Sequence, residues 1–223
     1  MQRSNLNRGE GRVAFLALTP FYALFLTFGL FPIAYSIYIA FFQWDPLGEH
    51  VFNGLDNFRN LIHDDRFWIA LRNTISIWLL STVPQLLAAL GLASILNKNR
   101  LRWSGFWRSA LLVPNITSTV AVAVVFSSIF GRDFGVINYL LHFFGIHKID
   151  WAVHVWSSHL EIAIMVMWRW TGYNALIYLA SMQSIPKELY EAAEIDGASS
   201  WQQFRYVTLP GIRNTIIFTA TVS

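Results

Sequence analysis

Apolar runs long enough to cross a membrane alternate with shorter polar segments along this chain. Between Arg12 and Asp45 lie 32 residues without a charge, and residues 73–97 form a second uncharged run of 25 residues. About 20 apolar residues suffice for a helix that spans a bilayer. The pattern therefore predicts membrane spans at residues 13–42, 73–97, 109–130 and 162–181.

A fifth apolar run begins after Arg213 and has ten residues up to Ser223. Ten residues of helix cover roughly 15 Å, about half of the hydrocarbon core of a bilayer. We therefore expect an incomplete fifth span at residues 215–223. The predicted fold class is an all-α integral membrane protein, a multi-span helical bundle truncated in its fifth span.

Lys and Arg are distributed unequally between the polar segments. If the N-terminus is cytoplasmic, the segments on the cytoplasmic side hold ten of these residues and the outer segments hold five. Positively charged residues gather on the cytoplasmic side of membrane proteins. This rule predicts a multi-pass protein of the cell membrane, with residues 1–12 as a cytoplasmic N-terminus, residues 13–223 as the transmembrane domain and residues 182–214 as a cytoplasmic loop.

The composition is typical of a membrane protein and excludes several other classes of protein and site. Hydrophobic residues make up 55% and charged residues 13% of the chain, whereas about a quarter of a soluble domain is charged. The formal charge of +3 is not gathered on one soluble face, so we expect membrane lipid and no nucleic acid as a partner. The absence of cysteine excludes disulfides and thiolate metal sites.

No catalytic motif is present. The sequence lacks a glycine-rich loop ending in Lys and Ser or Thr, so this chain is not expected to hydrolyse ATP, and we expect neither an enzyme nor a cofactor. The six histidines fall in predicted outer loops. Spacings of five residues, from His142 to His147 and from His154 to His159, are poor for a shared helical face, so no metal site is expected.

The predicted cytoplasmic loop carries start and stop signals for two short helices. Ser184 can cap the first helix, and Gly197 can end it in a left-handed conformation. Ser199 or Ser200 can cap a second helix, which Pro210 is expected to end. Three acidic side chains are available to meet basic groups on another surface: Glu191, Glu194 and Asp196. The loop therefore predicts a docking element.

The same loop resembles the EAA motif of the membrane subunits of bacterial ATP-binding-cassette (ABC) importers. The matching residues are Glu191, Ala192, Ala193, Asp196, Gly197, Ala198, Leu209 and Pro210. Other stretches are similar to the carbohydrate-uptake, maltose/glycerol-phosphate-like group: residues 54–61, Asn73, residues 112–114, Gly135 with Asn138, and residues 170–174. The resemblance implies a permease subunit of type I importer fold, whose members usually have six spans.

This resemblance also implies the partners and the roles of the loop. The loop would be the coupling helix that sits in a groove of a separate ABC ATPase subunit, with Glu191 and Gly197 as its sensitive positions. A second permease subunit and a periplasmic or lipoprotein solute-binding protein would complete the importer. A sugar or sugar derivative would be the substrate.

Arg169 is the only charge within the predicted span at residues 162–181. A charge at that depth costs at least about 2.5 kcal/mol unless it faces protein or water. One interpretation is a translocation pathway lined by Trp168, Arg169, Tyr173 and Asn174, because aromatic rings and polar donors suit a sugar. The other is a structural arginine that pairs with a carbonyl or carboxylate of a neighbouring helix.

Two further questions stay open on the sequence alone. Pro84, Gln85, Pro114 and Asn115 weaken regular helix bonding, either as kinks for alternating access or as static packing features.

Alternative functions are an importer permease for polyamines, amino acids or an oxyanion, an ion-driven secondary transporter, and a truncated assembly protein without transport. The predicted spans hold no carboxylate for a coupling ion, which disfavours the secondary transporter.

Overall fold

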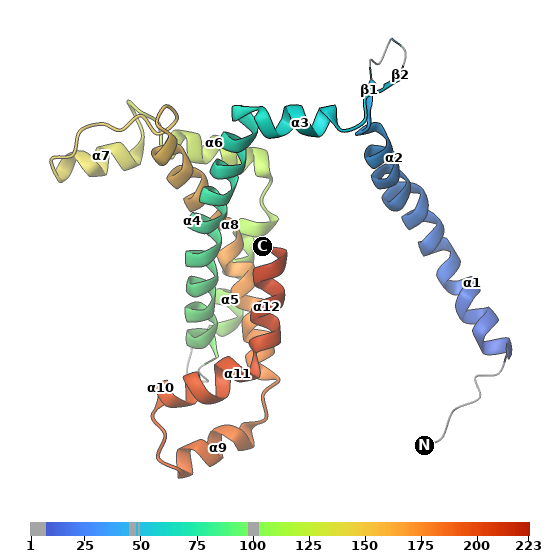
Figure 1. Ribbon diagram of the computed structural model, residues 1–223. Coiled ribbons are helices and arrows are strands. Elements are labelled where there is room, and N and C mark those ends of the chain that lie inside the picture. Colours follow the sequence, from blue (N-terminus) through green and yellow to red (C-terminus); the bar gives the residue numbers. More distant parts are fainter. Residues whose placement is uncertain (1–7, 45–47, 49, 98–102) are drawn as a thin grey trace. The chain divides into compact units, whose positions relative to one another are not determined.

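A computed structural model describes residues 8–44, 48, 50–97 and 103–223 (Figure 1). The chain divides into two compact units, Met1–Ala70 and Leu71–Ser223, and each is described by itself. Two parts of the predicted topology lie outside the described residues: the first seven residues of the N-terminus and the basic segment at residues 98–102.

The first unit begins with a long apolar helical path. It consists of α1 (Arg8–Phe25), the π-helical turn η1 (Leu26–Leu30) and α2 (Phe31–Ile39). In η1 the backbone N–H of Phe31 donates to the oxygen of Leu26, five residues earlier, directly before Pro32. Proline has no N–H and its ring crowds the preceding turn, and the wider π turn accommodates both effects. The helix therefore continues through the proline.

A small hairpin and a short helix follow this path. β1 (Phe42–Trp44) pairs antiparallel with β2 (His50–Phe52), with Phe42 opposite Phe52. The Nδ2 of Asn57, in α3 (Asp56–His63), donates to the backbone oxygens of Ala40 and Phe42. No strand was predicted here from the sequence. The hairpin was missed because its strands have just three residues each.

The second unit is built around two long helices and a shorter one. α4 (Asp65–Leu96) has its first turns in the first unit, α8 (Val155–Gln183) packs on it, and α12 (Arg213–Val222) packs on α8 (Figure 1). Hydroxyl pairs join α8 to α12: Tyr178 Oη lies 2.7 Å from Thr219 Oγ1, and Ser181 Oγ lies 2.8 Å from Thr215 Oγ1.

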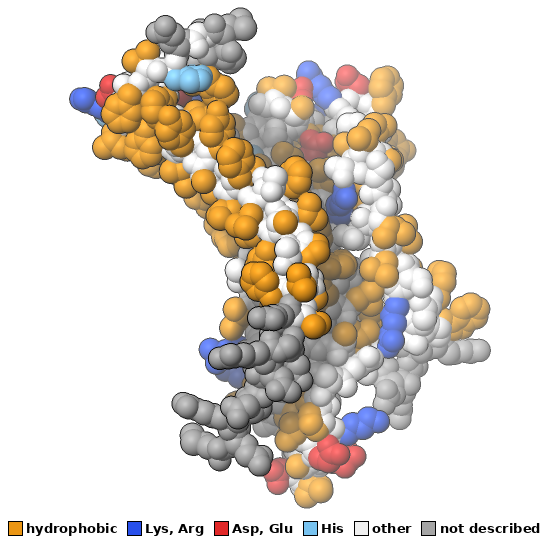
Figure 2. Space-filling view, turned by 90° about the vertical axis from the view of Figure 1, so that its right-hand side faces the viewer, with side chains coloured by type: hydrophobic (Ala, Val, Ile, Leu, Met, Phe, Trp, Pro, Cys, Tyr) orange, Lys and Arg blue, Asp and Glu red, His pale blue; other side chains and the backbone are white. Residues whose placement is uncertain are grey.

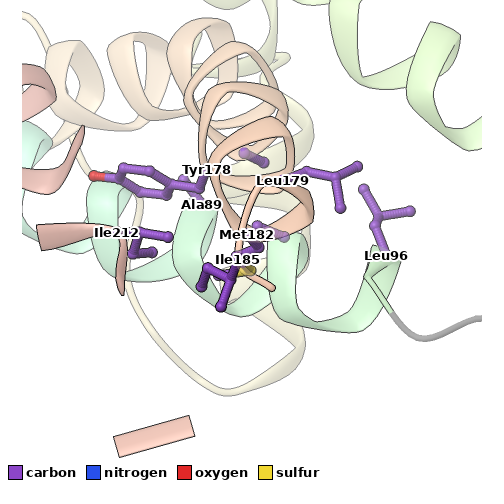
Figure 3. Packing of buried hydrophobic residues seen from close by; sticks show 9 residues of the cluster. Ala89, Leu96, Tyr178, Leu179, Met182, Ile185 and Ile212 are labelled. Carbon is purple, nitrogen blue, oxygen red and sulfur yellow. The ribbon is translucent and has the colours of Figure 1, made fainter. Parts of the chain in front are cut away.

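Small residues bring these helices close together. Ala89 and Ala93 on α4 are fully buried in one cluster with Tyr178 and Met182 on α8. Figure 3 shows Ala89, Tyr178 and Met182 gathered with Ile185 and Ile212. A second contact forms where α5 (Ser104–Ile116) crosses α8 at Gly172. A Cβ added at Gly172 would overlap the backbone oxygen of Leu111, so only glycine allows this approach.

The predicted span at residues 109–130 is not one straight helix. α5 ends at Ile116, α6 (Thr119–Ile129) follows, and the two helices are bent by 92°. Thr117 and Ser118 have extended backbone angles, and Thr117 Oγ1 donates to the oxygen of Val113 at 2.7 Å. The Thr117 hydroxyl thus donates to a backbone oxygen in the last turn of α5, where carbonyl groups lack N–H partners within the helix.

By length and hydropathy, two regions are candidate membrane spans, Phe15–Ile39 and Asp65–Leu96. α5 and α6 form a third candidate if the two bent helices together count as one span. α8 carries Glu161 and Arg169 among several polar residues and does not meet the same criterion, so its place in the membrane stays a prediction. α8 also begins earlier than predicted. His159, expected in an outer loop, is buried in this helix with Nδ1 3.0 Å from Ser76 Oγ.

A smaller core packs α6 against α7 (Val136–Phe143) and the segment before α8, next to Asn138 of α7. Its Nδ2 donates to the backbone oxygens of Arg132 and Ile149, each at 2.9 Å. Its Oδ1 accepts from the Ile149 N–H and from Trp151 Nε1, each at 3.2 Å. One buried side chain thus holds together the irregular segment between α6 and α8.

Replacement of Asn138 by leucine should destabilise this segment by about 3 kcal/mol, because three partly buried backbone groups and the buried Trp151 Nε1 lose their partner at once. Hydrogen exchange of the Ile149 amide in the detergent-solubilised protein reports the loss directly. Tyr139→Phe is a suitable control, since Tyr139 lies in the same helix but is exposed. Unchanged protection of the Ile149 amide in Asn138→Leu would contradict the assigned role.

Candidate functional site

The loop with the EAA motif folds as a bent helical hairpin, here called the EAA hairpin (residues 185–210). It contains α9 (Lys187–Ile195), α10 (Ser200–Gln203), the π-helical turn η2 (Phe204–Thr208) and the start of α11 (Leu209–Gly211). The hairpin connects the end of α8 to the start of α12.

The turn between α9 and α10 forms at Gly197 and Ser199, where the sequence predicts a helix stop and a helix start. Gly197 has φ +77°, and its N–H donates to the oxygen of Glu194 at 3.0 Å. Ser199 then starts α10 with a capping box: its N–H donates to Gln202 Oε1 at 2.7 Å, and its Oγ accepts from the Gln202 N–H. The predicted left-handed stop at Gly197 is confirmed, and the predicted cap is Ser199 rather than Ser200.

Two other local predictions are wrong. Ser184 does not cap α9: its Oγ donates back to the oxygen of Ser181, and Pro186 occupies the N-cap position. Pro210 does not end the second helix either, because it lies in the first turn of α11. The π turn before it lets the Leu209 N–H reach the oxygen of Phe204, so the proline ring is accommodated as at Pro32.

One face of the EAA hairpin is fixed to the helices above it. Ile185 is buried beside Gly211, where an added Cβ would lie 2.7 Å from Ile185 Cδ1. Tyr190 Oη lies 2.9 Å from Thr208 Oγ1 and ties α9 to η2. Phe204 and Val207 pack against the core shared by α4 and α8. The hairpin is therefore attached to α8 and α12 through side chains as well as through the chain itself.

The opposite face of the EAA hairpin is exposed, both apolar and acidic. Ile195 is 87% exposed, and red acidic and orange hydrophobic side chains meet at the lower end of Figure 2. The exposed side chains of the hairpin include Glu188, Leu189, Glu191, Glu194, Ile195, Asp196, Trp201 and Tyr206, together with the basic Lys187 and Arg205. Of the other motif positions, Ala192, Gly197 and Pro210 are exposed, and Ala193, Ala198 and Leu209 are half-buried. This combination is typical of a surface that binds another protein.

A cavity of about 490 Å³ lies between α4, α8 and α12. Two of its lining residues, Gln85 and Asn174, are only 1% and 4% exposed. The Nε2 of Gln85 and the Nδ2 of Asn174 have no hydrogen-bond partner among the described residues. A buried amide without a partner costs about 1–3 kcal/mol. Both groups are therefore available to a polar ligand.

The four residues predicted for a translocation pathway separate in the structure. Tyr173 and Asn174 line the cavity. Trp168 does not, and its ring instead packs against Phe126 with 5.6 Å between ring centroids. Arg169 does not line it either: its Nη1 donates to Thr119 Oγ1 at 2.6 Å, at the start of α6. This contact corresponds to the structural interpretation of Arg169, with a hydroxyl in place of the expected carbonyl or carboxylate.

Sequence reasoning missed the α4 wall of the cavity. Gln85 was considered only as a weak point of its helix. The signal was the spacing of Ser81, Thr82 and Gln85, which recur at three and four residues within an otherwise apolar run and so share a helical face. Trp170, which also lines the cavity, gave no separate signal.

Comparison with known proteins places these features in a family. A family model described as "Binding-protein-dependent transport system inner membrane component" matches residues 77–223. The chain is 36% identical to the lactose transport system permease protein LacF of Rhizobium radiobacter, over 99% of this chain and 74% of that protein. It is 34% identical to the arabinooligosaccharides transport system permease protein AraP of Bacillus subtilis (strain 168), over 94% of this chain and 66% of that one.

Solved structures agree. A chain of a bacterial ABC transporter involved in the import of the acidic polysaccharide alginate has a TM-score of 0.79 and 26% identity, covering 94% of this chain and 71% of that chain. The same comparison finds the bacterial alginate ABC transporter in complex with an alginate pentasaccharide-bound periplasmic protein, with a TM-score of 0.77 and 26% identity, over 92% of this chain and 68% of that one. The chain thus spans about two thirds to three quarters of the length of these relatives.

Proposed function

Since the chain belongs to the family of binding-protein-dependent transport system inner membrane components, we propose that it is the membrane-spanning subunit of an ATP-driven importer for sugars or sugar derivatives. The permease relatives named for lactose and arabinooligosaccharides support the solute class. Family membership argues against the alternative of an ion-driven secondary transporter. The chain contributes no ATPase of its own, so hydrolysis belongs to a separate subunit.

The observation that carries this proposal is the two-sided EAA hairpin. Its inner face is fixed to the core by Ile185, Tyr190 and Phe204, whereas its outer face leaves apolar and acidic side chains exposed. A rigidly attached element with an exposed outer face suits a partner that pushes or pulls on it. That partner would be the ABC ATPase, with Glu191 meeting a basic group and Gly197 keeping the turn compact.

The EAA hairpin is also directly connected to helices that line the cavity. It joins α8 to α12, and these two helices together with α4 line the cavity. The hydroxyl pairs from Tyr178 to Thr219 and from Ser181 to Thr215 hold α8 and α12 together. Movement of the hairpin would therefore shift two walls of the cavity relative to α4. In this proposal, closure of the ATPase subunits changes the access of the cavity in that way.

The remaining partners and the orientation belong to the same proposal. A second permease subunit would complete the pathway, and a periplasmic or lipoprotein solute-binding protein would deliver the sugar. The N-terminus and the EAA hairpin would face the cytoplasm, in keeping with the excess of Lys and Arg in those segments. A structural relative that was solved with a periplasmic binding protein supports a binding-protein partner. Tyr173 and Asn174 would lie on the solute path.

Transport by the reconstituted complex tests this function. Proteoliposomes that hold this permease, its partner permease and the ATPase should take up radiolabelled lactose, arabinotriose or maltotriose only when ATP is inside and the binding protein is outside. Omission of the ATPase subunit should reduce uptake to the level of empty liposomes. Uptake that an ion gradient drives without ATP would overturn the proposal.

A further inference from the structure

The face of α7 that points away from the core is apolar. α7 contains no Asp, Glu, Lys or Arg. Four of its exposed side chains recur at spacings of three and four residues and so share one face: Val136, Tyr139, Leu140 and Phe143. A helix at a water surface normally carries charged or polar side chains on the side away from its core. This face, here called the α7 aromatic face, is therefore poorly suited to water.

The opposite face of α7 is fixed to the protein. Ile137 and Leu141 pack against the smaller core beside α6. Asn138 Nδ2 donates to the oxygen of Ile149 at 2.9 Å, and its Oδ1 accepts from Trp151 Nε1 at 3.2 Å. Rotation of α7 that turned the aromatic face inward would break all of these contacts. Tyr139 and Phe143, which are 67% and 72% exposed, therefore stay on the surface of this chain.

α7 lies close to the end of the apolar helices. In Figure 1 it is crosswise to α4 and α8, at the end of the second unit opposite the EAA hairpin. The Gly135 N–H donates to the oxygen of Gly131 at 2.9 Å, and this tight turn keeps α7 next to the end of α6, a helix without charged residues. Trp156, in the first turn of α8, is exposed, and Trp is enriched where a bilayer meets water. These features place α7 at that level.

Charged side chains lie beside the α7 aromatic face rather than within it. A hollow next to α7 is lined by the apolar Phe134, Val136 and Tyr139 and by the polar Asp133, His142 and Lys148. Lys148 Nζ lies 3.6 Å from Asp133 Oδ1, and both side chains are largely exposed. Ionic groups of both signs next to aromatic and aliphatic groups match a phospholipid, in which a charged headgroup adjoins acyl chains.

We propose that α7 is a membrane-surface anchor, with its aromatic face in the lipid at the boundary of headgroups and acyl chains, on the membrane side opposite the EAA hairpin. The partner of this face is the bilayer, and the headgroups meet Asp133 and Lys148. Because Asn138 binds residues that closely precede α8, the anchor also fixes the start of α8 at the membrane surface. The inference goes beyond the proposed import function and does not depend on the solute.

Spin labels measure the depth of this face directly. The chain contains no cysteine, so a single nitroxide can be attached at Tyr139→Cys or at Phe143→Cys, with cysteine-free partner subunits. The complete complex of both permease subunits and the ATPase is placed in lipid nanodiscs without the binding protein. Oxygen, which concentrates in lipid, and a water-soluble nickel chelate then report the surroundings of each label. His147→Cys is the matched control, because His147 is also exposed but follows α7 and lies outside the aromatic face.

We expect the labels at positions 139 and 143 to be more accessible to oxygen than to the chelate, at a depth of about 5–10 Å, as for other interfacial helices. The label at position 147 should show the reverse. Phe143→Glu, which places a charge in the aromatic face, should move the label at position 139 towards water, whereas Phe143→Leu should leave it in place. ATP hydrolysis by each labelled complex shows that it has assembled.

Three results would overturn the inference. Access of the chelate to both labels, lost only when the binding protein is added, would make the face a docking surface for that protein. Labels that neither reagent reaches would show that the partner permease covers the face. An unchanged depth at position 139 in Phe143→Glu would show that α7 is held without lipid. ATP-dependent uptake can persist in all three cases, so failure of the anchor is distinct from failure of the proposed function.

Discussion

Reversal of the charge at Glu191 is expected to abolish ATP-driven uptake. In the proposed importer Glu191→Lys places a cation where the ATPase presents a basic group, and removal of one partner of such a pair costs about 2–5 kcal/mol of binding. That corresponds to a loss of about 30-fold to several thousand-fold in the docked population. The measurement is ATP-dependent sugar uptake in proteoliposomes, together with co-purification of the ATPase.

The fold of the permease should survive this change, because Glu191 is exposed and makes no ion pair among the described residues. Asp65→Lys serves as the control: it is the same reversal at an exposed acidic residue, placed in the first turn of α4 and outside the EAA hairpin. If Glu191→Lys takes up sugar at the wild-type rate while the complex remains intact, the hairpin is a connector and the proposed coupling role fails.

The addition of a single methyl group at Gly172 is expected to prevent folding of the second unit. In Gly172→Ala the new Cβ would overlap the backbone oxygen of Leu111, and a backbone atom cannot move aside as a flexible side chain can. α5 would have to separate from α8 along the contact that joins them. The expected cost is about 3 kcal/mol or more. The measurement is the yield of monodisperse protein after extraction from the membrane.

Gly91→Ala provides a matched comparison. Gly91 also lies within a long helix, α4, but an added Cβ there meets nothing within 4 Å. Alanine has a higher helix propensity than glycine by about 1 kcal/mol, so this variant should be as stable as wild type or slightly more stable. Equal yields for the two alanine variants would show that the contact of α5 with α8 is looser than described.

Features that depend on a few neighbouring residues could be predicted from the sequence. Gly197 ends α9 because a left-handed residue favours glycine, and the Ser199 and Gln202 side chains are close enough in the chain to form their capping box without outside help. The apolar runs likewise correspond to the long helices α4 and α8. Such signals are local, so they survive without knowledge of which helices pack together.

Features that depend on distant neighbours could not be predicted. The sequence does not reveal that Gln85 lies across a cavity from Asn174, because the two residues meet only when α4 packs on α8. For the same reason the role of Arg169 stayed open, because its hydrogen-bond partner at the start of α6 lies 50 residues away in sequence. The break at Thr117 and Ser118 was missed because neither residue is a strong helix breaker.

The π turn η2 has a consequence for the angular position of everything that follows it. A turn closed by an i→i+5 bond contains one residue more than an α-helical turn, and each residue of an α-helix advances by about 100° around the axis. The added residue between Phe204 and Thr208 therefore shifts the phase with which Gly211 reaches Ile185 and Ile212 enters the buried core. Pro210 disfavours return to the tighter winding. The Leu-Pro pair of the motif thus fixes the rotational phase with which the chain leaves the hairpin.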